Sequence, residues 1–234
     1  MRASKFVLLL RSKSSATPEL GREIALRTTA WRDAHRDTTE DVVVHVTESA
    51  PPRVTLVPFR REGFAMVSVR AEPAAIDALR TSLASMGRLA CYRVDESVPR
   101  ARARTEPAGS IAAGPALVTL FRKHPKLDRE TFLREWHGHH TPLALEVHPL
   151  VGYVRNVVRD LIDEEAPSWD GIVIESFARD ADVRSTVRFF GGPTASRARA
   201  VINAIRVGLH ASSFLDLRTI ENHLVTERAL DGAR

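Results

Sequence analysis

The chain has 234 residues, of which 44% are hydrophobic and 27% are charged, and these values are ordinary for a globular protein. Its net charge is +5, but Asp and Glu are interspersed with Arg and only 6% of the residues are aromatic, which argues against a nucleic-acid-binding surface. The single cysteine excludes an internal disulfide and favours a reducing compartment, and no apolar run approaches the roughly 20 residues of a membrane-spanning helix. We therefore expect a cytoplasmic protein that binds neither nucleic acid nor membrane.

The N-terminal part of the sequence predicts the element order β-α-β-β-α-β. Expected strands, indicated by apolar and β-branched runs, cover residues 5–11, 41–47, 64–70 and 89–94. The first expected helix begins after Thr17, a typical N-cap residue followed by Pro18, and carries apolar side chains at helical spacing up to Trp31. The second begins at Pro73 and ends near Gly87. This order is that of the split βαβ, or ferredoxin-like, unit.

Residues 97–114 separate this unit from the rest of the sequence. They are rich in Pro, Gly, Ala and Arg and show no hydrophobic periodicity, which is typical of a linker. We therefore expect an N-terminal unit over residues 1–96 and a C-terminal unit over residues 115–234.

The C-terminal unit repeats the same order of elements. Its expected strands cover residues 116–122, 152–158, 169–177 and 218–225, and its last helix covers residues 194–207. The first helix begins at the N-cap residue Asp128, and Trp136 and His140 near its end repeat the spacing of Trp31 and His35. The repeat predicts an α+β fold in which two ferredoxin-like βαββαβ units form an intramolecular dimeric α+β barrel. A homodimer of the whole chain stays open.

Several motifs of the C-terminal unit resemble the EthD domain family. In chain order they are Lys126-Leu127-Asp128, Trp136-x-x-x-His140-x-Pro142, Pro149-Leu-Val-Gly-Tyr153, Asp170-Gly171-Ile172 and Phe214-Leu-Asp216. That family belongs to the dimeric α+β barrel superfamily, so the resemblance implies this fold. It also implies that the N-terminal copy is degenerate, because Asp37-Thr38 stand there in place of Pro142-Leu143. Relatives in the superfamily include cofactor-independent monooxygenases, dehydratases, cyclases, isomerases and haem-handling enzymes.

His140 is the leading candidate for chemistry. It lies four residues after Trp136 and so on nearly the same helix face, which the resemblance turns toward a pocket between helices and sheet. An imidazole that is neutral near pH 7 can accept or give a proton. The alternative is a partly buried histidine that bonds a backbone group. His35 is a second catalytic candidate in more divergent surroundings, and Trp136 and Trp31 are the matching candidates for substrate contact.

Tyr153, Arg155 and Asn156 lie on one expected strand and are candidates for substrate binding. Alternation places Tyr153 and Arg155 on one face and Asn156 on the other, and one of these faces should meet the pocket. The Arg155 guanidinium could hold a carboxylate or enolate oxygen of the substrate, or it could form a surface ion pair.

Three further titratable residues lie in apolar segments. Asp216 stands between Leu215 and Leu217, and burial would raise its pKa and make it a catalytic proton carrier. The alternative is a carboxylate that caps the local turn. The strand pattern does not tell which way Glu175 and His223 face, so neither is assigned a role.

The sequence predicts neither a metal site nor an organic cofactor. His137, His139 and His140 cluster, with His148 nearby, but no His-Glu-x-x-His motif, cysteine pair or carboxylate at a standard ligand spacing accompanies them. We expect His137 and His139 to face solvent. Glycine-rich phosphate loops and Gly-x-Ser-x-Gly elbows are missing as well.

The expected function is that of an enzyme acting on a hydrophobic, oxygenated small molecule, such as an aromatic or polyketide-like compound. The expected step is proton transfer in a dehydration, isomerisation or cyclisation without a cofactor, with His140 as acid and base. Two alternatives stay open: a cofactor-independent or haem-dependent monooxygenase, and a non-catalytic protein that binds the small molecule.

Overall fold

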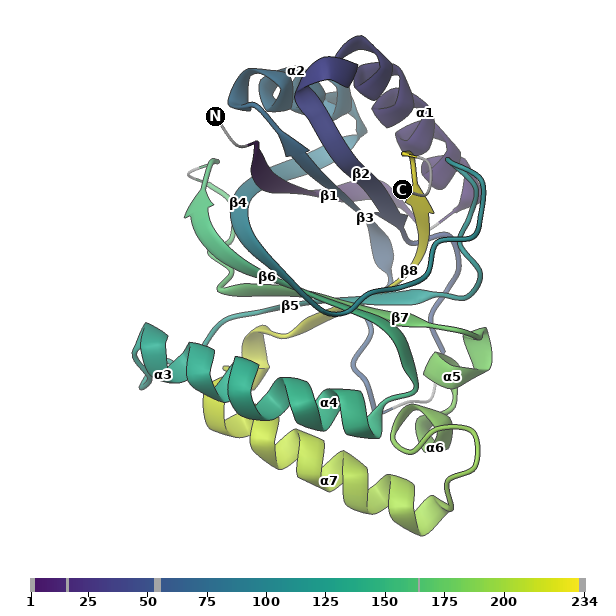
Figure 1. Cartoon of the computed structure of the whole chain (residues 1–234), viewed down its shortest axis with the longest axis vertical. Coiled ribbons are helices and arrows are strands. Elements are labelled where there is room, and N and C mark those ends of the chain that lie inside the picture. The colour runs from purple at the N-terminus through teal and green to yellow at the C-terminus, as the bar shows by residue number, and fades with distance from the viewer. Residues whose placement is uncertain (1–2, 16, 53–55, 164, 232–234) are drawn as a thin grey trace.

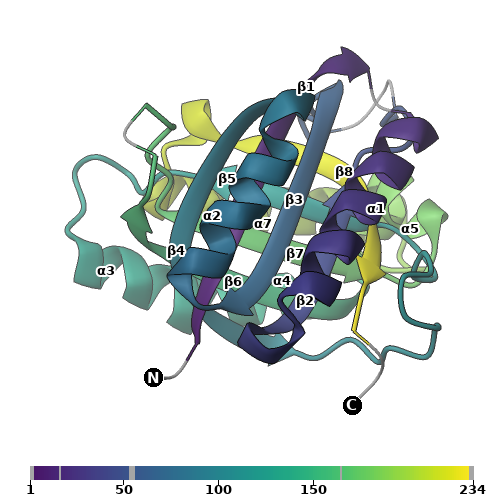
Figure 2. The same cartoon turned by 90° about the horizontal axis from the view of Figure 1, so that it is seen from above.

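The computed structural model describes residues 3–15, 17–52, 56–163 and 165–231. In its N-terminal half the main elements are β1 (Ser4–Ser15), α1 (Pro18–Ala34), β2 (Thr39–Val46), β3 (Glu62–Ala71), α2 (Pro73–Leu83) and β4 (Gly87–Arg100). The predicted N-cap of α1 is confirmed, because Thr17 Oγ1 accepts a hydrogen bond of 3.3 Å from Leu20 N. The strands pair in the order β2-β3-β1-β4, and both helices cover one face of these strands (Figure 2).

The C-terminal half has the same succession of strands, with additional helices. Its elements are β5 (Ala116–Phe121), α3 (Arg129–Arg134), α4 (Thr141–Val147), β6 (Leu150–Leu161), β7 (Gly171–Phe177), α5 (Asp180–Arg184), α6 (Thr186–Phe189), α7 (Arg197–Phe214) and β8 (Glu221–Ala229). A π-helical turn, Glu135–His140, joins α3 directly to α4. The strands pair in the order β8-β5-β7-β6, the same relative order as in the N-terminal half.

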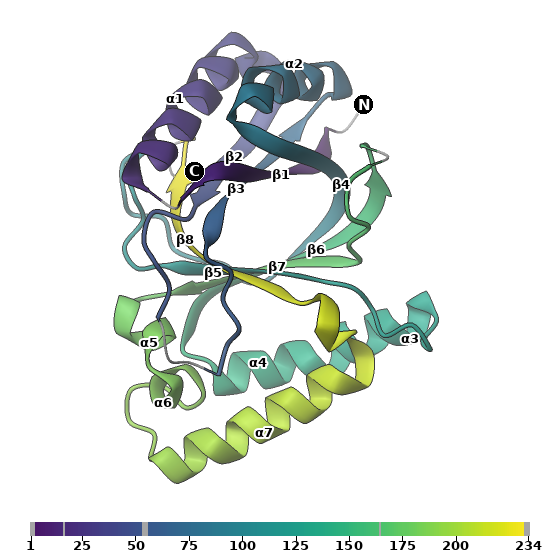
Figure 3. The same ribbon diagram turned by 180° about the vertical axis from the view of Figure 1, so that it is seen from behind.

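Two strand pairs join the halves into one barrel. β2 pairs with β8 and β4 pairs with β6, both antiparallel, so the described strands close in the order β1-β3-β2-β8-β5-β7-β6-β4. Helices α1 and α2 cover one side of the barrel, and α4 and α7 cover the opposite side (Figures 1 and 3). The architecture is an α+β barrel with helices on two outer faces. No helix within the described ranges is long and apolar enough to cross a membrane.

The buried apolar side chains of the described residues form three clusters, because both faces of the strands carry apolar residues. One cluster fills the barrel interior with side chains from both halves, Phe64 and Val118 among them. A second lies between the N-terminal strands and α1 and α2, and it contains Trp31. The third lies between the C-terminal strands and α3, α4 and α7, and it contains Trp136 and Phe214.

The structure differs from the sequence-based expectation at the centre of the chain. The composition of residues 97–114 predicts a linker, but β4 continues into this segment as far as Arg100. There it pairs with β6, opposite Tyr153 and Arg155. Pairing with a partner strand holds the segment extended although its own pattern has no strand periodicity. α7 is also longer than predicted and ends at Phe214.

Candidate functional site

A pocket of about 330 Å³ lies between the C-terminal strands and helices α4 and α7. Its lining is mostly apolar, and the polar side chains that reach it are Thr119, His140, His148, Tyr153, Glu175 and Asn222. The segment between β2 and β3 contributes Leu56, Val57 and Pro58. Figure 3 shows this segment running from the barrel toward the helices of the C-terminal half. Both halves of the chain therefore build the pocket.

Glu175 is a buried carboxyl group on β7. On β7, Ile172 and Ile174 point into the barrel, whereas Val173, Glu175 and Phe177 point toward the helices. Glu175 is 8% exposed and forms no hydrogen bond or ion pair with a described residue. Burial without such a partner raises its pKa to about 7. The group can therefore exist in both protonation states near neutral pH.

The π-helical turn determines where His140 points. Thr141 N and Thr141 Oγ1 both donate to Trp136 O, the hydroxyl at 2.9 Å, which makes the turn wider than an α-helical one. Pro142 follows directly and has no N–H to continue the regular ladder. Such turns occur frequently at functional sites.

The His140 ring packs between the pocket and α7. Its Nδ1 lies 3.3 Å from His210 Nδ1, and its ring centroid lies 4.9 Å from that of Phe214. Burial, with smaller contributions from the charges of His210 and His148, lowers the pKa of His140 to about 3. At pH 7 this imidazole is neutral, with one nitrogen as donor and the other as acceptor.

His148 and Tyr153 are also neutral at pH 7. His148 Nδ1 donates to Phe189 O at 2.8 Å, which leaves Nε2 as an acceptor, and burial lowers its pKa to about 4. Tyr153 is 2% exposed, and burial, with a smaller contribution from the charge of Glu175, raises its pKa. The pocket thus contains uncharged donors and acceptors in an apolar wall.

Three of the residues that the sequence singled out line the pocket, namely Trp136, His140 and Tyr153. Asp216 does not. It caps the short 3₁₀ turn that follows α7, accepting from Arg218 N at 3.3 Å and pairing with the Arg218 guanidinium. The hydrogen bond from the Arg218 side chain, above all, lowers the pKa of Asp216. The prediction of a buried proton carrier is corrected to the alternative, a turn-capping carboxylate.

His35 and Trp31 belong to the N-terminal helices and their core. His35 Nδ1 lies 2.8 Å from Trp31 O at the end of α1, and Trp31 Nε1 donates to Ala75 O at 2.8 Å. Trp31 is enclosed by the N-terminal outer cluster. Neither residue lines the pocket.

Arg155 and Asn156 lie on opposite faces of β6, as predicted, but outside the pocket. Arg155 donates to Thr141 Oγ1 at 2.9 Å and to Ser97 Oγ at 3.0 Å. Asn156 is fully buried on the other face, where Nδ2 donates to Ile172 O. Arg155 therefore braces the start of α4 against β4, and Asn156 is a structural residue of the barrel.

Sequence reasoning named Glu175 and His148 but placed neither of them in the pocket. A signal for Glu175 existed, since it is the only charged residue in the otherwise apolar and small run of β7. His148 was noted only as a neighbour of the histidine cluster, because its place in the pocket depends on how α4 ends against Phe189. The side chain of His139 is 59% exposed, as predicted, whereas His137 is half-buried and burial lowers its pKa to about 4.

Comparison with known proteins identifies the fold. No protein-family model matches the chain, and no curated protein matches it. A solved structure described as an anthrone oxidase-like protein superposes with a TM-score of 0.58 at 13% identity, over 99% of this chain and 93% of that chain. Candidate monooxygenases from Fusobacterium nucleatum and Lactobacillus acidophilus superpose with TM-scores of 0.49 at 9% identity, over 99% of this chain and 94% and 98% of theirs.

The structure with the TM-score of 0.58 establishes a shared architecture over nearly the whole chain. The chain has an α+β barrel fold. At 13% identity the likeness shows the fold alone, and the specific resemblance to the EthD family stays a prediction.

Proposed function

We propose that this protein is an enzyme that moves a proton on a hydrophobic, oxygenated small molecule without a bound cofactor, with Glu175 as general acid and base. The observation that carries this proposal is the Glu175 carboxyl group, which lies on the wall of an apolar pocket and forms no hydrogen bond or ion pair with a described residue. General acid–base catalysis is most effective when the catalytic pKa lies near the working pH, and that of Glu175 is about 7. His140, to which the sequence assigned this role, lines the same pocket and is the second candidate.

The lining of the pocket defines the substrate class. Aromatic and aliphatic side chains suit a hydrocarbon skeleton, and the few neutral polar groups suit its oxygen atoms. Tyr153 is the cross-strand neighbour of Glu175 and lines the same pocket. Its hydroxyl group can therefore donate to a carbonyl oxygen beside the carbon that Glu175 deprotonates. The enolate so formed can take a proton elsewhere, expel a hydroxyl group or close a ring, which are the steps of isomerisation, dehydration and cyclisation.

We further propose that the two halves are copies of one ferredoxin-like unit, residues 1–96 and 115–234, joined by residues 97–114. The equal strand orders of the two halves support this. The EthD resemblance then applies to the C-terminal copy, which holds Glu175 and His140. The N-terminal copy completes the barrel and covers one side of the pocket.

The test is a screen of aromatic and polyketide-like ketones and alcohols for turnover, followed by substitutions on the best substrate. Glu175→Gln keeps the shape of the side chain but cannot transfer a proton, so we expect kcat to fall by about 10²–10⁴-fold. Glu72→Gln changes an exposed carboxylate outside the pocket and should leave kcat unchanged. An unchanged kcat in Glu175→Gln would remove this residue from the mechanism. Tight binding of these compounds with no turnover would favour a non-catalytic binding protein.

A second candidate function is cofactor-independent oxygenation. The solved structure with the TM-score of 0.58 is named as anthrone oxidase-like, and the same base could deprotonate a methylene group next to a carbonyl. The carbanion would react with O₂, converting CH₂ into C=O and releasing one water molecule. An oxygen electrode separates the two functions, because proton transfer alone consumes no O₂.

A further inference from the structure

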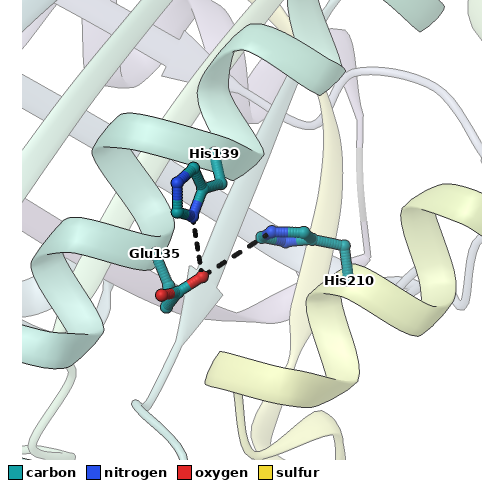
Figure 4. Close-up of side chains that lie close together, drawn as sticks. All are labelled: Glu135, His139 and His210. Atoms are coloured by element: carbon teal, nitrogen blue, oxygen red, sulfur yellow. Dashed lines mark hydrogen bonds and ion pairs between the residues drawn. The ribbon is translucent and has the colours of Figure 1, made fainter.

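A second group of titratable side chains lies outside the pocket, where the π-helical turn meets α7. Figure 4 shows Glu135 and His139 on the turn and His210 on α7, all directed toward one another. Glu135 Oε2 lies 2.9 Å from His139 Nδ1 and 3.9 Å from His210 Nε2. One ligand atom from each residue lies within 4.8 Å of the other two. Two imidazole nitrogens and one carboxylate oxygen thus converge on one point.

We propose that Glu135, His139 and His210 bind one divalent transition-metal ion, with Zn²⁺ as the expected occupant. Zn²⁺ binds imidazole nitrogen and carboxylate oxygen at about 2.0–2.2 Å, so neighbouring ligand atoms in a tetrahedral site stand roughly 3.4 Å apart. The separations of 2.9 and 3.9 Å lie on either side of that value, and small side-chain rotations reach it. Imidazole nitrogens select Zn²⁺ over Mg²⁺ or Ca²⁺, which require oxygen ligands.

The surroundings leave room for the ion and its water ligands. The side chains of His139, Glu135 and His210 are 59%, 27% and 23% exposed, so water can complete the coordination. Arg134 lies 3.9 Å from Glu135 Oε1, which leaves Oε2 for the ion. Glu135 and His139 alone could be explained as an ion pair within one helical turn. His210 lies on a different helix, so a pair within the turn does not account for its position beside Glu135.

The proposed ion is connected to the pocket through His140. If His210 Nε2 binds the ion, the proton of the neutral ring must lie on Nδ1, and metal-bound histidines donate this N–H to a neighbouring acceptor. The acceptor here is His140 Nδ1, at 3.3 Å, so the proton of His140 must lie on Nε2. The ion would hold His140 in one tautomer. Any effect on catalysis rests on the proposed function, but ion binding itself does not.

Calorimetric titration of the EDTA-treated chain with Zn²⁺, supported by Co²⁺ absorption spectra, tests the site. We expect one ion per chain and an affinity that falls at least about tenfold in His139→Ala and in Glu135→Gln. His124→Ala removes a histidine outside the cluster and should bind Zn²⁺ like the wild type. Absence of binding by both methods, or equal affinity in the wild type, His139→Ala and Glu135→Gln, would overturn the proposal.

The link to His140 has its own readout, independent of any substrate. Long-range ¹H–¹⁵N spectra of the Zn²⁺-loaded protein report which ring nitrogen of each histidine carries the proton. We expect the proton of His140 on Nε2 and that of His210 on Nδ1. A proton on His140 Nδ1 in the loaded protein would refute the link, and a lack of enzymatic turnover would bear only on the function of the pocket.

Discussion

Glu175→Gln should stabilise the folded protein at pH 8 far more than at pH 4. Burial holds the pKa of the carboxyl group at about 7, against an ordinary value of 4.5. Between these values the folded chain keeps a proton that the unfolded chain has lost, so the free energy of unfolding of the wild type falls as the pH rises through this window. The gap corresponds to roughly 3 kcal/mol. Glutamine does not ionise, so the variant has no such loss.

Urea unfolding at pH 4, 6 and 8 gives the free energy of unfolding of the variant and of the wild type. In the difference between these two free energies the titration of other groups largely cancels. We expect the difference to increase by roughly 2–3 kcal/mol from pH 4 to pH 8. The exposed Glu72→Gln should show no such trend. A difference that stays constant with pH would mean that Glu175 ionises as it does in water. The reasoning that makes it a base with a pKa near neutrality would then be refuted.

Other experiments probe the pocket and the core separately. Ala211→Phe places a ring in the pocket and should weaken the binding of a fluorescent hydrophobic ligand roughly tenfold or more, whereas Ala198→Phe, exposed on the same helix, should not. Burial lowers the pKa of His148 to about 4, so between pH 6.5 and 4 the unfolded chain binds a proton that the folded chain does not, and the free energy of unfolding falls with the pH. His148→Phe removes this group, so its free energy of unfolding, measured by urea unfolding, should fall less over the same range. Cys91 is fully buried and burial raises its pKa to about 12, so iodoacetamide should label it only after unfolding; labelling of the native protein would contradict this.

Local sequence patterns were sufficient to predict where α1 and α3 begin and where most of the strands lie. Thr17 and Asp128 were predicted as N-caps, and both accept the expected hydrogen bond from the backbone three residues on. The continuation of β4 to Arg100 could not be predicted in this way, because β6, its partner there, lies more than fifty residues away along the chain.

The candidate site was predictable where the side chains share one helix or one strand. Trp136 and His140 meet the pocket because the helix spacing places them together. The partner of His140 is His210, on a helix seventy residues further on, and only the packing of α7 against the π-helical turn brings the two rings together. The facing of Glu175 depends on the register of β7 in the assembled sheet.

The helices that cover the two halves of the barrel carry side chains of different size where they face the sheet. In the N-terminal half, α2 places Leu79 and Leu83 against the sheet, and Trp31 Nε1 donates to a carbonyl oxygen of α2 at 2.8 Å. In the C-terminal half, α7 lines the pocket with Val207 and Phe214 and, between them, with the small residues Gly208 and Ala211. Burying each additional CH₂ group would stabilise the fold by about 0.8 kcal/mol, so larger side chains on α7 would favour a closed pocket. Selection for stability alone would favour larger side chains on α7 and an apolar residue in place of Glu175. The small side chains and the buried carboxyl group are therefore what a site kept for chemistry requires.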